Sequence, residues 1–179
     1  MSQHLSAPSM DGSAAKFSVG KSTPYAAALW WKQLGAHPTA SHFIYDLYYY
    51  TTTPGAAQAL EFDANQSFGG HKYIFGTECS IGRKEWDVYD ATKHWVHTGV
   101  GCTPPAAYKW HHLTWEFQRV SGKVKYISVT LDGKKSYLNR VYSPKTGSAK
   151  ELNVAFQMDE NGSGTGYSVS VDKISFKYW

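Results

Sequence analysis

Apolar and polar residues alternate along most of the chain, with the period of two that is typical of β-strands with one buried face. No long segment has the spacing of an amphipathic helix. Turn residues separate the alternating runs, as at Asp132-Gly133. The pattern predicts strands over residues 14–19, 27–34, 41–52, 57–66, 71–78, 85–89, 94–98, 108–120, 123–131, 134–142, 151–158 and 167–178. Antiparallel strands at this spacing favour an all-β sandwich or barrel.

The alternation also assigns side chains to the two faces of each strand. In the strand over 57–66, Leu60 and Phe62 share one face, and Glu61 shares the other with further polar residues. We expect polar side chains of three strands to line one sheet face: Glu61, Asp63, Asn65, Gln118, Asn153 and Gln157. Amides and carboxylates pair well with sugar hydroxyls, because each hydroxyl both donates and accepts a hydrogen bond. An ordinary solvated face is the alternative interpretation.

Aromatic residues make up 16% of the chain, nearly as much as the charged residues at 18%. Flat rings can cover the C–H face of a sugar and bury area at little entropic cost. The candidates for such stacking are Trp86, Tyr89, Trp95 and one of the pair Trp30 and Trp31. Trp31 is two residues from Leu29, so the two side chains share one face of the strand. If the apolar Leu29 faces the core, Trp30 is the outward ring. The alternative for each ring is a place in the core.

The net charge of +4 comes from scattered Lys and Arg, so the sequence does not indicate a nucleic-acid interface. It contains no run of 18 apolar residues and therefore no predicted membrane span. Residues 1–12 are polar, lack the apolar segment of a secretory signal, and are predicted as a lead-in to a single domain over 13–179. We expect a monomer or one part of a larger secreted protein.

The two cysteines, Cys79 and Cys102, lie in loop-rich sequence. We expect a disulfide between them, which implies an extracellular or periplasmic location. Two free buried thiols are the alternative. Their spacing is not that of a zinc site.

One long segment points to a known superfamily. Trp110-His111-His112-Leu113-Thr114-Trp115-Glu116-Phe117, followed by Gly122-Lys123-Val124 and Leu131-Asp132-Gly133-Lys134, resembles the concanavalin A-like (laminin-G-type) jelly roll. In that superfamily a Trp-His-hydrophobic strand leads to a hairpin and then to an x-Asp-Gly turn. The stretches at 8–13 and 171–176 are similar to the opening and closing strands of such domains. The resemblance implies an all-β, concanavalin A-like antiparallel β-sandwich.

Within this superfamily, Glu61-Phe62-Asp63-Ala64-Asn65-Gln66 resembles the catalytic strand of laminarinase- and lichenase-type β-glucanases, whose pattern is Glu-x-Asp-x-x-Glu. Glu61 matches the nucleophile and Asp63 the helper, but Gln66 stands where the acid/base is expected. An amide cannot give up a proton at useful pH, and loss of general-acid help costs roughly 10²–10⁴ in rate. The departure therefore predicts a protein that holds sugar without cutting it.

The sequence thus predicts a lectin-like, non-catalytic carbohydrate-binding module, whose partner is a polysaccharide or glycan. Its concave sheet face would carry Glu61, Asp63, Gln118, Asn153 and Gln157, rimmed by Trp86 and Trp95. The further residues expected to bind the ligand are Asn65, Gln66 and Tyr89. A divergent glycoside hydrolase or polysaccharide lyase is one alternative, with Glu61, Asp63 and either Glu116 or Glu78 in place of the missing acid. A structural adhesion domain is another.

No cofactor is required by this interpretation. The resemblance implies a Ca²⁺ ion near the termini, as jelly-roll sugar modules often hold one. Asp11 and Asp172 are the oxygen donors expected there. The acidic turn Asp159-Glu160-Asn161-Gly162 is a further candidate, although it lacks the spacing of a full calcium loop.

Overall fold

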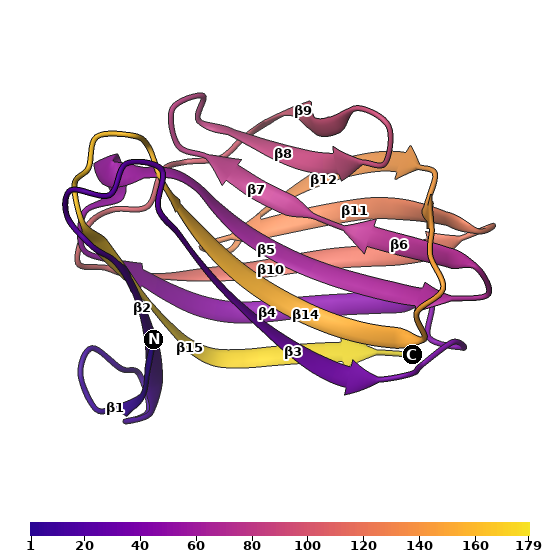
Figure 1. Ribbon diagram of the computed structural model, residues 1–179, viewed down its shortest axis with the longest axis horizontal. Coiled ribbons are helices and arrows are strands. Elements are labelled where there is room, and N and C mark those ends of the chain that lie inside the picture. The colour runs from indigo at the N-terminus through magenta and orange to yellow at the C-terminus, as the bar shows by residue number, and fades with distance from the viewer.

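A computed structural model describes residues 1–179 and shows a sandwich of two antiparallel β-sheets (Figure 1). The first sheet has the order β1 (Ser2–Leu5), β2 (Ala14–Val19), β15 (Tyr167–Tyr178), β4 (His42–Thr51), β10 (Trp110–Val120), β11 (Lys123–Leu131) and β12 (Lys134–Tyr142). The expected all-β jelly-roll sandwich is therefore confirmed. The structure contains no helix of the length and apolarity that a membrane span needs.

The second sheet is built around β5 (Ala57–Phe68). On one side β5 pairs with β14 (Glu151–Glu160), which in turn pairs with β3 (Ala27–Gly35). On its other side it pairs with β6 (His71–Phe75) along one half and with β7 (Thr77–Ser80) along the other. The sheet then continues from β7 to β8 (Glu85–Asp90) and β9 (His94–Gly101), while the short β13 (Lys145–Thr146) pairs with β6.

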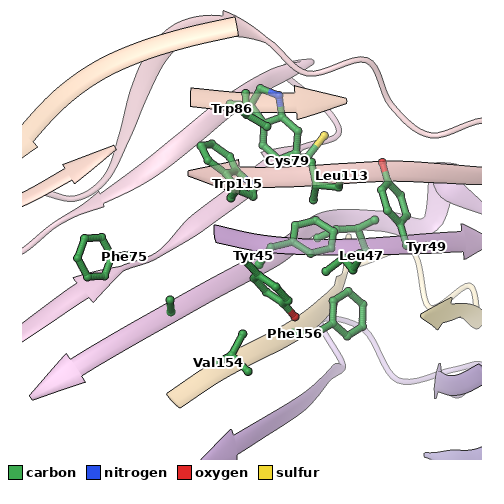
Figure 2. Close-up of a cluster of buried hydrophobic side chains, with 14 of the residues drawn as sticks. Tyr45, Leu47, Tyr49, Phe75, Cys79, Trp86, Leu113, Trp115, Val154 and Phe156 are labelled. Atoms are coloured by element: carbon green, nitrogen blue, oxygen red, sulfur yellow. The ribbon is translucent and has the colours of Figure 1, made fainter. Parts of the chain in front are cut away.

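An aromatic core of 32 buried residues fills the space between the sheets. Every second residue of β4, of β14 and of β10 as far as Phe117 is buried, as the period of two requires. Figure 2 shows Trp86 from the second sheet beside Trp115 from the first, and their rings meet edge to face with centroids 5.1 Å apart. The core therefore takes one face of each sheet and leaves the other face of each to solvent or ligands.

Most predicted strands are present, with ends shifted by a few residues. Two short strands, β1 and β13, were not predicted, and β1 lies within the expected lead-in of residues 1–12. The predicted strand over 71–78 is divided into β6 and β7 at Gly76. A Cβ atom on Gly76 would lie 2.9 Å from Cβ of Tyr89, so the backbone approaches β8 more closely there than any other residue would allow.

The disulfide between Cys79 and Cys102 is confirmed, with Cα atoms 5.7 Å apart. Cys79 lies in β7, and Cys102 directly follows β9. Both residues are almost fully buried. The bond therefore links the strands β7 and β9 across the intervening β8.

Candidate functional site

One row of polar side chains crosses the outer face of the second sheet. The register places Glu61 of β5 opposite Gln157 of β14 on one side and opposite Glu78 of β7 on the other. Glu78 is opposite Asp87 of β8, which is opposite His97 of β9. Directly opposite residues point to the same face, so all five side chains share it. With strands 4.7–4.9 Å apart, the row is roughly 19 Å long.

Three residues of this row, Glu61, Glu78 and His97, line a groove of about 550 Å³, called here the acidic groove. Most of its lining comes from β5, β7 and β9, and β8 lies between β7 and β9 in the sheet (Figure 1). The residues that line it are Tyr25, Gln58, Ala59, Glu61, Glu78, Arg83, Trp95, His97, Asp159 and Glu160. Most are polar, and two aromatic rings stand among them.

Three carboxyl groups in and beside the acidic groove, those of Glu61, Glu78 and Asp63, hold their protons unusually tightly. Burial, together with the nearby carboxylates of Asp63, Asp159 and Glu78, raises the pKa of Glu61 to about 9. Burial raises the pKa of Glu78 to about 8 with help from Asp87, while Arg83 opposes the rise. Burial also raises the pKa of Asp63 to about 7, against the hydrogen bond donated by the Thr77 amide. These groups titrate as a coupled set, so their protons are shared among them near neutral pH.

The charges of the acidic groove predict a loss of stability as the pH rises from about 5 to 9. The folded-state pKa values of Glu61, Asp63 and Glu78 lie above their ordinary values, so the folded protein binds more protons than the unfolded chain in this range. Their contribution is complete below about pH 4 and is lost as the pH passes through the raised values. We expect a fall in the free energy of unfolding on the order of 2 kcal/mol, because coupled groups lose less than the sum of their separate shifts.

Urea unfolding at a series of pH values measures this loss, and Glu61→Gln should flatten the curve because it removes one of the titrating groups. Carboxyl groups with lowered pKa values, such as those of Asp132 and Asp172, make the free energy of unfolding rise with pH instead of fall. Their contribution is lost only as the pH falls below about 4, outside the tested range. A stability that is constant or rises between pH 5 and 9 would contradict the prediction.

The amide of Gln157 holds two of the groove carboxyl groups in place. Gln157 donates from Nε2 to Glu61 Oε1 at 3.0 Å and to Asp159 Oδ1 at 3.0 Å. Further along the same face, Asn65 donates from Nδ2 to Asn153 Oδ1 at 3.1 Å. The predicted grouping of Glu61, Asn65, Asn153 and Gln157 on one sheet face is therefore present.

At the far wall of the acidic groove, the half-exposed Arg83 and His97 both contact the buried Asp87. Asp87 is fully buried, and its carboxylate accepts a hydrogen bond from the guanidinium of Arg83. His97 Nδ1 lies 2.8 Å from Asp87 Oδ1. Arg83 Nη2 is also 3.7 Å from Glu78 Oε1. Arg83, Asp87 and His97 were not predicted as site residues, and Asp159 was predicted only as part of the acidic turn at 159–162.

The aromatic candidates divide between the groove and the core. Trp95 is partly buried, lines the acidic groove, and packs edge to face on Tyr89 with centroids 5.7 Å apart. Tyr89 lies behind it, where its hydroxyl accepts a hydrogen bond from Lys145 Nζ at 2.6 Å. The prediction that Trp86 rims the site is wrong, since its side chain is 1% exposed and belongs to the core.

The preference for Trp30 as the outward ring is also wrong. Trp30 packs against the core, whereas Trp31 is 57% exposed on the outer face of β3. The reason is that Leu29, whose parity guided the choice, is itself exposed. Trp31 is opposite the small Ala155, and Ala155 is opposite Asp63, so this ring stands on the same face as the groove, two strands from β5.

Gln66 is not part of the acidic groove. It shares the inward parity of Phe62 and is 1% exposed. Its Nε2 donates to the carbonyls of His37 and Ala40, each at 2.8 Å, and its Oε1 accepts from Arg119 Nε at 3.0 Å. The identity of this residue therefore says nothing about acid catalysis in the groove, and the prediction that it marks a lost proton donor is withdrawn.

Gln118 and Glu116 lie on the wrong sheet to share a site with Glu61. Both belong to β10 and point to the outer face of the first sheet, on the opposite side of the sandwich. Glu116 accepts hydrogen bonds from Ser128 and Lys135 and lies 3.0 Å from His42 Nε2. It cannot replace an acid in the groove, because two sheets and the core separate them.

Asp11 and Asp172, the expected calcium donors, meet at the N-terminal segment. Both oxygens of Asp172 already accept hydrogen bonds, Oδ2 from Ser9 Oγ and the Met10 amide and Oδ1 from the Lys173 amide. Asp11 accepts from the Ser13 amide. A carboxylate surrounded by donors fits an anchor for this segment better than a cation ligand, and calcium binding here stays a prediction.

The acidic turn at 159–162 is similarly self-contained. Glu160 is fully buried and accepts hydrogen bonds from the Tyr25 and Gly162 amides and from Ser163 Oγ. Although burial opposes the change, these hydrogen bonds lower the pKa of Glu160 to about 2. This carboxylate fixes the loop that carries Tyr25 at one end of the acidic groove.

The sequence matches no family of known proteins and no curated protein. Solved structures of carbohydrate-active proteins share its fold. An alginate lyase from Aplysia kurodai is 11% identical with a TM-score of 0.64, and 94% of this chain covers 84% of that one. The alginate lyase Aly36B bound to an alginate trisaccharide is 9% identical with a TM-score of 0.63, covering 95% and 83%. An endo-β-1,4-glucuronan lyase from the fungus Trichoderma reesei is 10% identical with a TM-score of 0.61, covering 98% and 85%.

Proposed function

We propose that the protein binds a polysaccharide chain across the outer face of its second sheet. The observation that carries this proposal is the acidic groove, a hollow of about 550 Å³ lined by carboxyl groups, a glutamine and two aromatic rings. The names of the structural neighbours, all acting on polysaccharides, support the same class of ligand. The disulfide supports a secreted, extracytoplasmic protein, where such polymers are found.

The groove residues match the chemistry of sugars. A carboxyl group that keeps its proton can both donate to and accept from a hydroxyl, and the raised pKa values of Glu61 and Glu78 favour that state. The exposed ring of Trp31 and the partly buried ring of Trp95 stand on the same sheet face, on β3 and β9. The face between them spans six strands, roughly 24 Å. An extended chain crossing the strands could therefore contact both rings and the carboxyl row.

The charges favour an uncharged polysaccharide. Only Arg83 and His97 bring basic groups into the lining, and both are already bonded to Asp87. A polyuronate such as alginate would bring its carboxylates into a groove that offers no free cation and that also carries the ionised carboxylate of Glu160. We therefore propose binding of a neutral chain and do not propose a polyuronate lyase.

Replacing Trp95 with alanine is expected to weaken polysaccharide binding about tenfold, the order of the loss of one stacked ring. Tyr137→Ala is the matched control, because Tyr137 is 64% exposed on β12 of the other sheet. Retardation in native gels that contain mixed-linkage β-glucan, xylan, galactomannan or alginate measures the change. Thermal unfolding confirms that both variants fold.

Equal retardation of both variants and the wild type would remove Trp95 from the site. Retardation by alginate alone would overturn the proposal of a neutral ligand. If the wild type binds none of the four polymers, the proposed function fails.

A further inference from the structure

We infer that the binding site extends beyond the acidic groove into a second hollow of about 300 Å³, which holds a further part of the same polysaccharide chain. This second hollow, called here the loop hollow, is lined by Gly55, Ala57, Gln58, Ser80, Ile81, Gly82, Arg83 and Asn161. The inference rests on the proposed function, since the chain must first occupy the acidic groove. It adds a contact region that contains no residue of the polar row across the sheet.

The two hollows adjoin one another. Gln58 and Arg83 line both of them, so these two side chains stand at the junction. Gln58 is exposed near the start of β5, and Arg83 is half-exposed in the turn between β7 and β8. A chain that lies in the acidic groove can therefore continue past these two side chains into the loop hollow.

Hydrogen bonds fix the segments that enclose the loop hollow. Asn161 Nδ2 donates to the Gly55 carbonyl at 2.8 Å and joins the loop after β14 to the turn before β5. The Ile81 amide donates to the Gln58 carbonyl at 3.1 Å and joins the β7–β8 turn to the start of β5. The loop hollow is therefore formed before a ligand arrives, and binding requires little ordering of the protein.

Two glycines keep the loop hollow open. Gly55 and Gly82 both line it, and neither has the positive φ that would require glycine. A Cβ atom on either residue would meet no atom of a residue outside its chain neighbours within 4 Å, so the packing does not require glycine either. Glycine is the usual residue where a ligand approaches the backbone closely. The two glycines are therefore explained by a sugar that contacts the backbone at these positions.

The lining of the loop hollow suits a neutral sugar. Gln58 supplies an amide and Ser80 a hydroxyl, and each can both donate to and accept from a sugar hydroxyl. Ile81 is partly buried and offers an apolar surface to the C–H face of a sugar ring. No carboxyl group lines the loop hollow, and its one charged residue, Arg83, is already bonded to Asp87. The same class of ligand therefore fits both hollows.

Filling the loop hollow with a side chain tests the inference. Gly82→Leu is expected to weaken polysaccharide binding about tenfold, because the new side chain excludes the sugar and the one or two hydrogen bonds that it makes. Gly55→Leu, on another wall of the loop hollow, should have the same effect. Gly20→Leu is the matched control, since a Cβ atom on Gly20 also meets open space and Gly20 lines neither hollow.

Retardation in native gels that contain mixed-linkage β-glucan, xylan or galactomannan measures the change, and thermal unfolding confirms that the three variants fold. Calorimetry with oligosaccharides of increasing length, prepared from the same polymers, distinguishes a lost contact from a disturbed groove. Oligosaccharides short enough to occupy only the acidic groove should bind Gly82→Leu and the wild type equally. Longer oligosaccharides should gain affinity for the wild type alone. Equal weakening at every length would overturn the inference, because the substitution would then act on the groove itself.

The retardation results also separate the inference from the proposed function. Weaker retardation of Gly82→Leu and Gly55→Leu, with Gly20→Leu unchanged, supports the extended site. A polymer that retards the wild type and both filled variants equally overturns the role of the loop hollow and leaves the proposed function standing. A wild type that binds none of the polymers overturns both.

Discussion

Replacing both cysteines with alanine is expected to lower the free energy of unfolding by about 3 kcal/mol. The bridge between Cys79 and Cys102 closes a loop with a sequence separation of 23, and a loop of that length restricts the unfolded chain by about this amount. Alanine avoids placing new hydroxyl groups in a site that is 1% exposed. Urea unfolding of the double variant against the wild type measures the difference.

The loss should be larger than the small cavity would produce, because the bond also joins two walls of the acidic groove. Cys79 follows Glu78 directly, and Cys102 follows the strand that carries Trp95 and His97. Reduction of the wild type with dithiothreitol under native conditions is the matched control, since it opens the bond without changing a side chain. A double variant within about 0.5 kcal/mol of the wild type would show that the packing alone holds these strands.

Replacing Gln66 with glutamate is expected to destabilise the protein by about 3 kcal/mol at neutral pH and to add no hydrolytic activity. The amide donates to the carbonyls of His37 and Ala40, and a carboxylate would place a negative oxygen 2.8 Å from both. Arg119 would offset part of the cost, because its contact with Oε1 would become a charged one. The remaining loss follows from the negative charge placed against two carbonyl oxygens, which keep only the Ala40 amide and Arg119 Nη2 as donors.

Two measurements distinguish this from the one-strand active site that the motif suggests. Urea unfolding should show a smaller loss at low pH, where the introduced carboxyl is protonated and can donate one hydrogen bond. Gln118→Glu, on the outer face of the first sheet, is the matched control and should lie within about 0.5 kcal/mol of the wild type. A stable Gln66→Glu variant with raised turnover on β-glucan would restore the motif interpretation and contradict the buried role.

The errors at single residues share a physical cause. Gln66 has the same parity as Phe62, and Trp86 the same parity as Val88, so the alternation already pointed both inward. A motif resemblance and the chemistry of a ring were given more weight than that alternation. For Trp31 the alternation itself misled, because Leu29 is an exposed apolar residue at the edge strand β3. Exposed apolar residues are common on folded proteins and weaken any choice made from one neighbour.

Local pattern was sufficient for the strands, the sandwich class and the outward face of β5, because side-chain direction in a strand depends only on counting by two. The same pattern placed Glu61, Asp63 and Asn65 together before any fold was known. Which strands become neighbours is different, since long-range pairing depends on how the whole core closes. Only the folded sandwich puts Glu78 of β7 beside Glu61 and carries Glu116 to the opposite side. The carboxyl pair and the groove around it therefore arise from tertiary structure.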